Sequence, residues 1–96
     1  MQYVSHPAHP WRRLREAHPG VYERPIADAP APDAWVRLRV VVAHPMVRVH
    51  VNGAAEPSLT VRRLGPQQRG RVGLWVGNPS GGDFAGLSVA PAAAGR

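Results

Sequence analysis

The chain contains no cysteine and no lysine, and only 6% of its residues are aromatic. Without cysteine, disulfides cannot stabilise the fold and a thiolate zinc site is excluded. No apolar run is long enough to span a membrane as a helix. Residues 1–7 lack the basic segment and apolar run of a signal peptide. We therefore expect a soluble protein without a membrane partner and without a signal peptide of its own, and the compartment stays open.

Arginine alone carries the positive charge, because all 12 basic residues are arginine and the net charge is +6. These arginines are scattered as singles and pairs, with no basic block. A scattered surplus of this kind is typical of biased codon usage. An anion-binding surface for nucleic acid is the alternative. We do not expect nucleic acid as the partner.

Glycine and proline are abundant, with 10 and 11 residues, and both are costly inside a helix. Long helices are therefore not expected, and residues 11–16 predict a single helical turn. Residues 21–24 predict a short strand that ends at Pro25. Residues 27–34 are rich in Ala, Pro and Asp and predict a connecting loop. Residues 1–34 thus form a loop-rich N-terminal segment with one or two short strands.

Apolar and polar side chains alternate with period two through the rest of the chain, which is typical of half-buried strands. Residues 35–42 and 46–51 predict an antiparallel hairpin, and Asn52-Gly53 predicts a turn because both residues tolerate positive φ. Three further strands are predicted at 58–63, 71–77 and 84–89. Together they form a sheet core over residues 35–90, followed by a disordered tail at 91–96.

Each predicted strand has one apolar face, and such a face needs a second layer to cover it. Residues 1–34 are too polar and proline-rich to provide that cover. We therefore predict an all-β fold, an antiparallel β-sandwich of the jelly-roll type, of which this chain holds a part. The uncovered sheet should self-associate face to face, pair through an open edge strand, or aggregate.

The order of the motifs resembles a known superfamily. The segments are WVRLRV at 35–40, VHVNG at 49–53, PSLTV at 57–61, GRVGLWVG at 70–77 and GDFAGLSV at 82–89. They resemble the C-terminal half of a concanavalin A-like lectin/glucanase sandwich. Within it they are closest to laminin-G-like bacterial domains called 3-keto-disaccharide hydrolase or family 16 glycoside-hydrolase-like. The resemblance covers residues 35–90 and implies a jelly-roll sandwich that carries lectins, adhesive modules and hydrolases alike.

The acids do not form a glycosidase motif. Glycoside hydrolysis usually needs two carboxylates across the scissile bond, and the related glucanases present theirs on a Glu-x-Asp-x-x-Glu strand that this chain lacks. Glu23 is the one acid on a predicted strand, and an ion pair with Arg13 or Arg15 explains it. We predict no catalytic residue in this chain.

Metal and cofactor sites are not expected either. His6, His9 and His18 are candidates for a metal, but each precedes a proline and has no carboxylate at ligand spacing. Asp83 is the single acid with chemistry suited to calcium, and one carboxylate is weak evidence. We predict no metal and no cofactor.

Aromatic rings provide the candidate ligand site, because sugars stack on exposed rings through their apolar C–H faces. Trp75 and Trp35 fall opposite the apolar faces of their predicted strands, and Arg37 and Arg39 share that side of the Trp35 strand. Tyr22 and Glu23 complete the candidate set. The alternative is that this face packs under a loop or under the rest of the sandwich, with both tryptophans in a core.

These observations favour a non-catalytic carbohydrate-binding or structural β-sandwich module. The alternative is a fragment of a glycoside-processing enzyme of the keto-disaccharide hydrolase type, whose catalytic groups lie outside this chain. An arginine-rich nucleic-acid binder is the third hypothesis.

Overall fold

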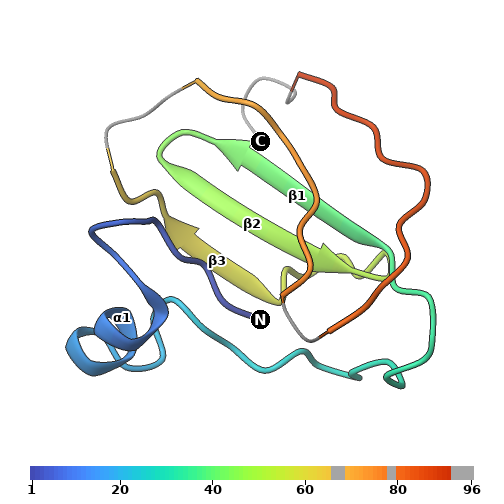
Figure 1. The fold of residues 1–96 in the computed structure, drawn as a ribbon, viewed down its shortest axis with the longest axis horizontal. Coiled ribbons are helices and arrows are strands. Elements are labelled where there is room, and N and C mark those ends of the chain that lie inside the picture. The colour runs from blue at the N-terminus through green and yellow to red at the C-terminus, as the bar shows by residue number, and fades with distance from the viewer. Residues whose placement is uncertain (66–68, 78–79, 92–96) are drawn as a thin grey trace.

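A computed structural model describes residues 1–65, 69–77 and 80–91. The elements, in chain order, are α1 (Trp11–Ala17), β1 (Leu38–Ala43), β2 (Met46–Val51) and β3 (Leu59–Arg62). The strands form one antiparallel sheet in the order β1-β2-β3, and α1 lies to one side of it (Figure 1). In these described ranges, no helix has the length and apolar character needed to cross a membrane.

Helix α1 is longer than the single turn predicted from the sequence. It spans 7 residues and begins after Pro10, whose carbonyl accepts a hydrogen bond from Leu14 N at 3.1 Å. It ends at Ala17: His18 is the C-cap residue, and Pro19 has no N–H with which to continue the ladder. Leu14 is its one buried side chain. This helix also makes the all-β prediction incomplete.

The predicted hairpin is confirmed, but β1 begins at Leu38 instead of residue 35. Leu38, the first residue of β1, pairs with Val51, the last residue of β2. The chain then turns at Asn52, which has a φ of 52°. Beyond the pair of Leu38 and Val51, Asn52 N donates to Arg37 O at 2.8 Å and Arg37 N donates to the side-chain oxygen Asn52 Oδ1 at 2.9 Å, in place of a backbone carbonyl. Gly53 also has a positive φ, of 75°, so the predicted turn at Asn52-Gly53 is confirmed.

The third predicted strand is also confirmed, as β3. Val47 pairs with Val61 and Val49 pairs with Leu59. Two backbone hydrogen bonds extend the contact beyond the strand, from Ser58 N to Val49 O at 2.8 Å and from Arg63 N to Pro45 O at 2.7 Å.

One face of the sheet is apolar, because residues paired directly across antiparallel strands point to the same side. This face carries Leu38, Val40, Val42, Val47, Val49, Val51, Leu59 and Val61. Its β2–β3 half contains the buried residues Val47, Val51, Leu59 and Val61. The core of the protein therefore lies against this half of the face.

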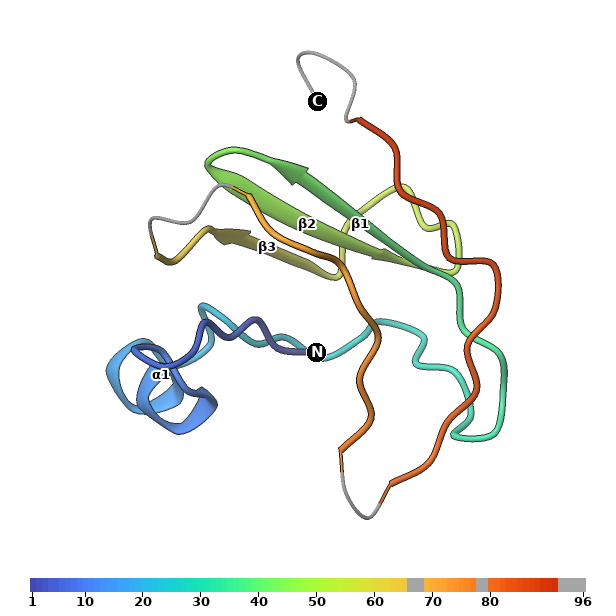
Figure 2. The same ribbon diagram turned by 45° about the horizontal axis from the view of Figure 1, so that its top comes forward.

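The N-terminal segment covers that half, so the expectation that residues 1–34 are too polar to do so is wrong there. Met1, Tyr3 and Tyr22 pack against the buried cluster. The segment is held as a short two-stranded bridge, with hydrogen bonds from Tyr3 N to Tyr22 O at 2.9 Å and from Arg24 N to Met1 O at 3.0 Å. Figure 2 shows it lying beneath the sheet. A hydrogen bond from Leu64 N to the Tyr3 hydroxyl, 3.1 Å, ties it to the end of β3.

The β1 half of the same face is uncovered, as the sequence predicted for the whole sheet. Leu38, Val40 and Val42 are 58%, 56% and 51% exposed. We call these three side chains the β1 row. No backbone hydrogen bond from another described segment reaches the outer edge of β1.

The strands predicted at 71–77 and 84–89 are wrong, because these residues are irregular in the structure. Residues 69–77 run across the sheet without pairing with it (Figure 1). Val72, Leu74, Phe84, Leu87 and Val89 all remain more than half exposed. A second sheet does not occur among the described residues, so the sandwich stays a prediction. The predicted tail lies outside them, apart from Pro91.

Candidate functional site

Trp75 is the most exposed large apolar side chain of the described chain, at 85%. Its position depends on Gly77. A Cβ built at Gly77 would lie 3.2 Å from Trp75 Cη2 and 3.5 Å from Cζ3, so the six-membered ring of the indole lies close over the glycine backbone. Glycine permits this approach because it has no side chain in the way. The indole thus rests on the chain and is otherwise open to solvent.

Trp35 is 71% exposed and precedes β1 by three positions. Arg37 lies two positions after it, and its backbone makes two hydrogen bonds with Asn52, including one from Asn52 N to Arg37 O at 2.8 Å. Arg39 lies on the polar face of β1, opposite His50 of β2. The sequence placed Trp35 and Trp75 opposite the apolar faces of their predicted strands, so the two rings would share one face if both strands joined one sheet. Residues 71–77 do not join it, so that shared face is absent.

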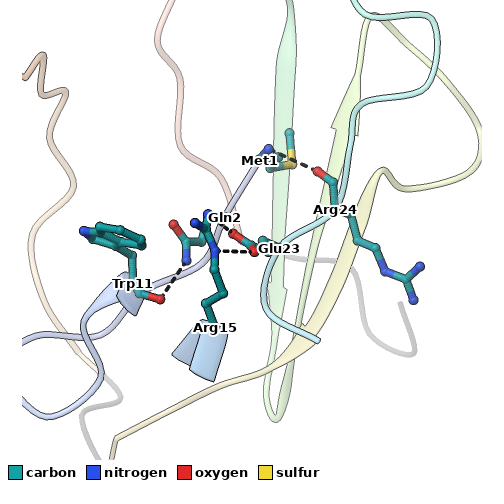
Figure 3. A network of polar contacts seen from close by, with 6 residues as sticks. All are labelled: Met1, Gln2, Trp11, Arg15, Glu23 and Arg24. Atoms are coloured by element: carbon teal, nitrogen blue, oxygen red, sulfur yellow. Dashed lines mark hydrogen bonds and ion pairs between the residues drawn. The ribbon is translucent and has the colours of Figure 1, made fainter. Parts of the chain in front are cut away.

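Tyr22 and Glu23 are engaged in the N-terminal segment. Tyr22 stacks on Tyr3 with 6.4 Å between ring centroids, and His18 meets it edge-on at 5.8 Å. Glu23 accepts two hydrogen bonds from Arg15, from Nε to Oε1 and from Nη2 to Oε2, both 2.8 Å (Figure 3). The predicted ion pair is therefore confirmed, with Arg15 as the partner, while Arg13 donates to Ala8 O.

The pair with Arg15 sets the ionisation of Glu23. The Arg15 hydrogen bonds hold the pKa of Glu23 below its ordinary value, against the opposing effect of its partial burial. A carboxylate with a lowered pKa stays ionised at neutral pH and is poorly suited to act as a general acid. Around the pair, Met1 N donates to Arg24 O at 3.1 Å and Gln2 Nε2 donates to Trp11 O at 3.3 Å (Figure 3).

The pair makes a small, pH-dependent contribution to stability. Because the pKa of Glu23 is lowered on folding, the stabilisation is present above the pKa of the unfolded chain and is lost as the pH falls through the folded-state pKa. Glu23→Gln should lower the Tm slightly at neutral pH and flatten its acid dependence. Glu16→Gln, an exposed acid on α1, is the control. Thermal unfolding from neutral to acid pH checks this, and identical profiles for all three proteins would contradict it.

A groove with mixed polar and apolar lining, at one end of the sheet, was not predicted from the sequence. It lies between residues 24–28 and 51–60 and has a volume of about 610 Å³. Its polar lining residues are Arg24, Asp28, Asn52, Glu56, Ser58 and Thr60. Carboxylates, amides and hydroxyls of this kind bind sugar hydroxyls well. The turn predicted at residues 52–53 contributes Asn52 to one wall of the groove. Nothing in the sequence indicated that residues 24–28 lie beside it.

Metal-ligand chemistry is not assembled in the described part of the chain, where no three His, Asp or Glu side chains gather. Comparisons with protein-family models, with curated proteins and with solved structures find no match for this chain. The resemblance of residues 35–90 to laminin-G-like domains therefore stays a prediction. The fold defines a β-protein with a three-stranded antiparallel sheet and one short helix.

Proposed function

We propose that this chain is a non-catalytic carbohydrate-binding β-module in which Trp75 is the stacking platform for a sugar ring. The observation that carries the proposal is the 85% exposure of an indole that rests on Gly77. An exposed tryptophan forgoes the stabilisation of burial. A sugar ring would restore it, because its apolar C–H face matches the size and shape of the indole.

The distribution of apolar residues supports this assignment. Only Leu14, Val47, Val51, Leu59 and Val61 are buried among the described hydrophobic residues, and none of them is aromatic. A chain with so small a core would gain stability from burying its largest side chains, yet Trp75 and Trp35 remain exposed to solvent. The groove at the end of the sheet carries hydrogen-bonding groups of the type that fix the orientation of a sugar, and Trp75 is not among its lining residues.

Catalysis by Glu23 is disfavoured because this carboxylate is already engaged. Glu23 is held in two hydrogen bonds by Arg15. A glycosidase acid needs a raised pKa, whereas the pKa of Glu23 is lowered. The same fold is also compatible with a laminin-G-like sandwich and with a purely structural role. A polysaccharide-binding assay distinguishes a structural module from a sugar-binding one.

Trp75→Ala should weaken polysaccharide binding roughly tenfold or more, as removal of an aromatic stacking partner does for other ring ligands. It should leave the Tm unchanged, because the indole is mostly exposed. Affinity electrophoresis against neutral β-glucan, xylan and mannan measures the effect. The matched control is Phe84→Ala, which removes an exposed aromatic ring of the same C-terminal region.

Two results would contradict the proposal. If the unmodified protein binds none of these neutral polysaccharides and no acidic polysaccharide, the module is structural. If it binds and Trp75→Ala binds equally well, the stacking platform lies elsewhere.

A further inference from the structure

The polar face of the sheet carries a row of arginines that crosses all three strands. Arg39 of β1 pairs with His50, and the neighbouring pair on this face is Val41 with Arg48. Arg39 and Arg48 are therefore diagonal neighbours. On the other side of β2, Arg48 pairs with Thr60 and Met46 pairs with Arg62, so Arg62 is the next diagonal neighbour. We call Arg39, Arg48 and Arg62 the arginine row.

Nothing on the sheet neutralises this row. The sequences of β1, β2 and β3 contain no Asp or Glu. None of the three arginines makes an ion pair with a described residue. The Cα atoms of diagonal neighbours on a sheet lie roughly 7–8 Å apart, and like charges on side chains at that spacing repel. The fold thus tolerates a repulsion that bound anions would relieve.

The arginine row is also accessible. The N-terminal segment covers the opposite face, where Tyr3 and Tyr22 contact the core (Figure 2). Arg39 and Arg62 are exposed and Arg48 is half-buried. Val41, between Arg39 and Arg48 on this face, is half-buried as well, as expected where arginine stems cover an apolar neighbour. A row of guanidiniums that crosses three strands on one face of a sheet fits an extended chain of negative groups.

We infer that this face binds an acidic polysaccharide through the carboxylates of its uronic acid units, an inference that rests on the proposed carbohydrate-binding function. Guanidinium groups bind carboxylates in two parallel hydrogen bonds. Single-stranded nucleic acid fits less well, because its binding sites stack bases on aromatic side chains. The strand residues of this face include no Phe, Tyr or Trp.

The test compares two variants of equal charge. Arg39→Gln/Arg48→Gln removes two charges from the row, and Arg12→Gln/Arg13→Gln removes two from α1, so both take the net charge from +6 to +4. Isothermal titration at fixed low salt uses polygalacturonate, a neutral β-glucan and oligo-dT as probes. The row variant should lose roughly tenfold or more in affinity for polygalacturonate and keep its affinity for the glucan. The α1 variant should bind both as the unmodified protein does.

Each other outcome overturns a specific statement. Equal losses in both variants would show that net charge, not the arginine row, sets the affinity. Tighter binding of oligo-dT, lost in the row variant, would make nucleic acid the ligand of this face. Binding of the glucan without polygalacturonate would overturn the acidic ligand and leave carbohydrate binding intact. Binding of no polysaccharide would overturn both proposals.

Discussion

Leu59→Ala should lower the free energy of unfolding by about 2–4 kcal/mol, the cost of deleting most of a buried leucine and leaving a cavity. Leu59 is only 3% exposed and contacts the buried cluster with Val47 and Val61. A small domain is stable by about 5 kcal/mol or little more, and one with so few buried side chains should be near the lower limit. A large fraction of the variant should therefore be unfolded at ordinary temperature.

Urea unfolding followed by circular dichroism measures this effect, and the sheet offers a matched control. Leu38→Ala makes the same substitution on the same face, but Leu38 is 58% exposed in the β1 row. It should cost less than about 1 kcal/mol, because little apolar surface leaves a buried environment. Equal losses for the two variants would mean that the β1 half of the face is covered after all.

Val40→Arg should abolish the self-association that we propose for this protein. Val40 is the centre of the β1 row, which leaves three apolar side chains exposed beside a strand edge that pairs with no other described segment. We propose that copies of the chain associate through this surface, because contact there removes apolar area from water. A buried, unpaired arginine at the same place would be strongly unfavourable.

Sedimentation velocity over a range of concentrations tests this proposal. The unmodified protein should sediment faster as its concentration rises, and Val40→Arg should not. Val72→Arg is the control, since Val72 is similarly exposed, at 67%, but lies in an unpaired segment. A monodisperse monomer for the unmodified protein at every concentration would show that the β1 row stays solvated.

The hairpin and β3 could be predicted because their alternation is local and the turn at Asn52-Gly53 is encoded by residues that tolerate positive φ. The start of β1 at Leu38 could not, since the alternation runs back to residue 35 but the partner strand β2 ends at Val51, opposite Leu38. The segments at 71–77 and 84–89 alternate just as well, yet they form no strand. Alternation indicates which side chains could share a face, but a strand also needs a partner for its backbone.

The N-terminal cover and the candidate site show the same limit. Few large apolar residues precede residue 35. Met1, Tyr3 and Tyr22 are nevertheless enough to cover the β2–β3 half of the apolar face, because this half is only two strands wide. The ion pair of Glu23 was predictable from nearby arginines. The groove and the arginine row were not, because each joins residues distant in the chain through the register of the sheet.

The carbohydrate-binding claim is tested most directly by the indole N–H signals of the three tryptophans, observed by nuclear magnetic resonance during titration with polysaccharide. Trp11 is an internal control, because its ring is flanked by Arg12 and Arg15 at 5.3 and 4.9 Å from the ring centroid. Tryptophan-to-phenylalanine variants assign the signals. The signal of Trp75 should shift in a saturable way while that of Trp11 stays in place. Three unmoved signals at saturating polysaccharide would contradict the proposed function.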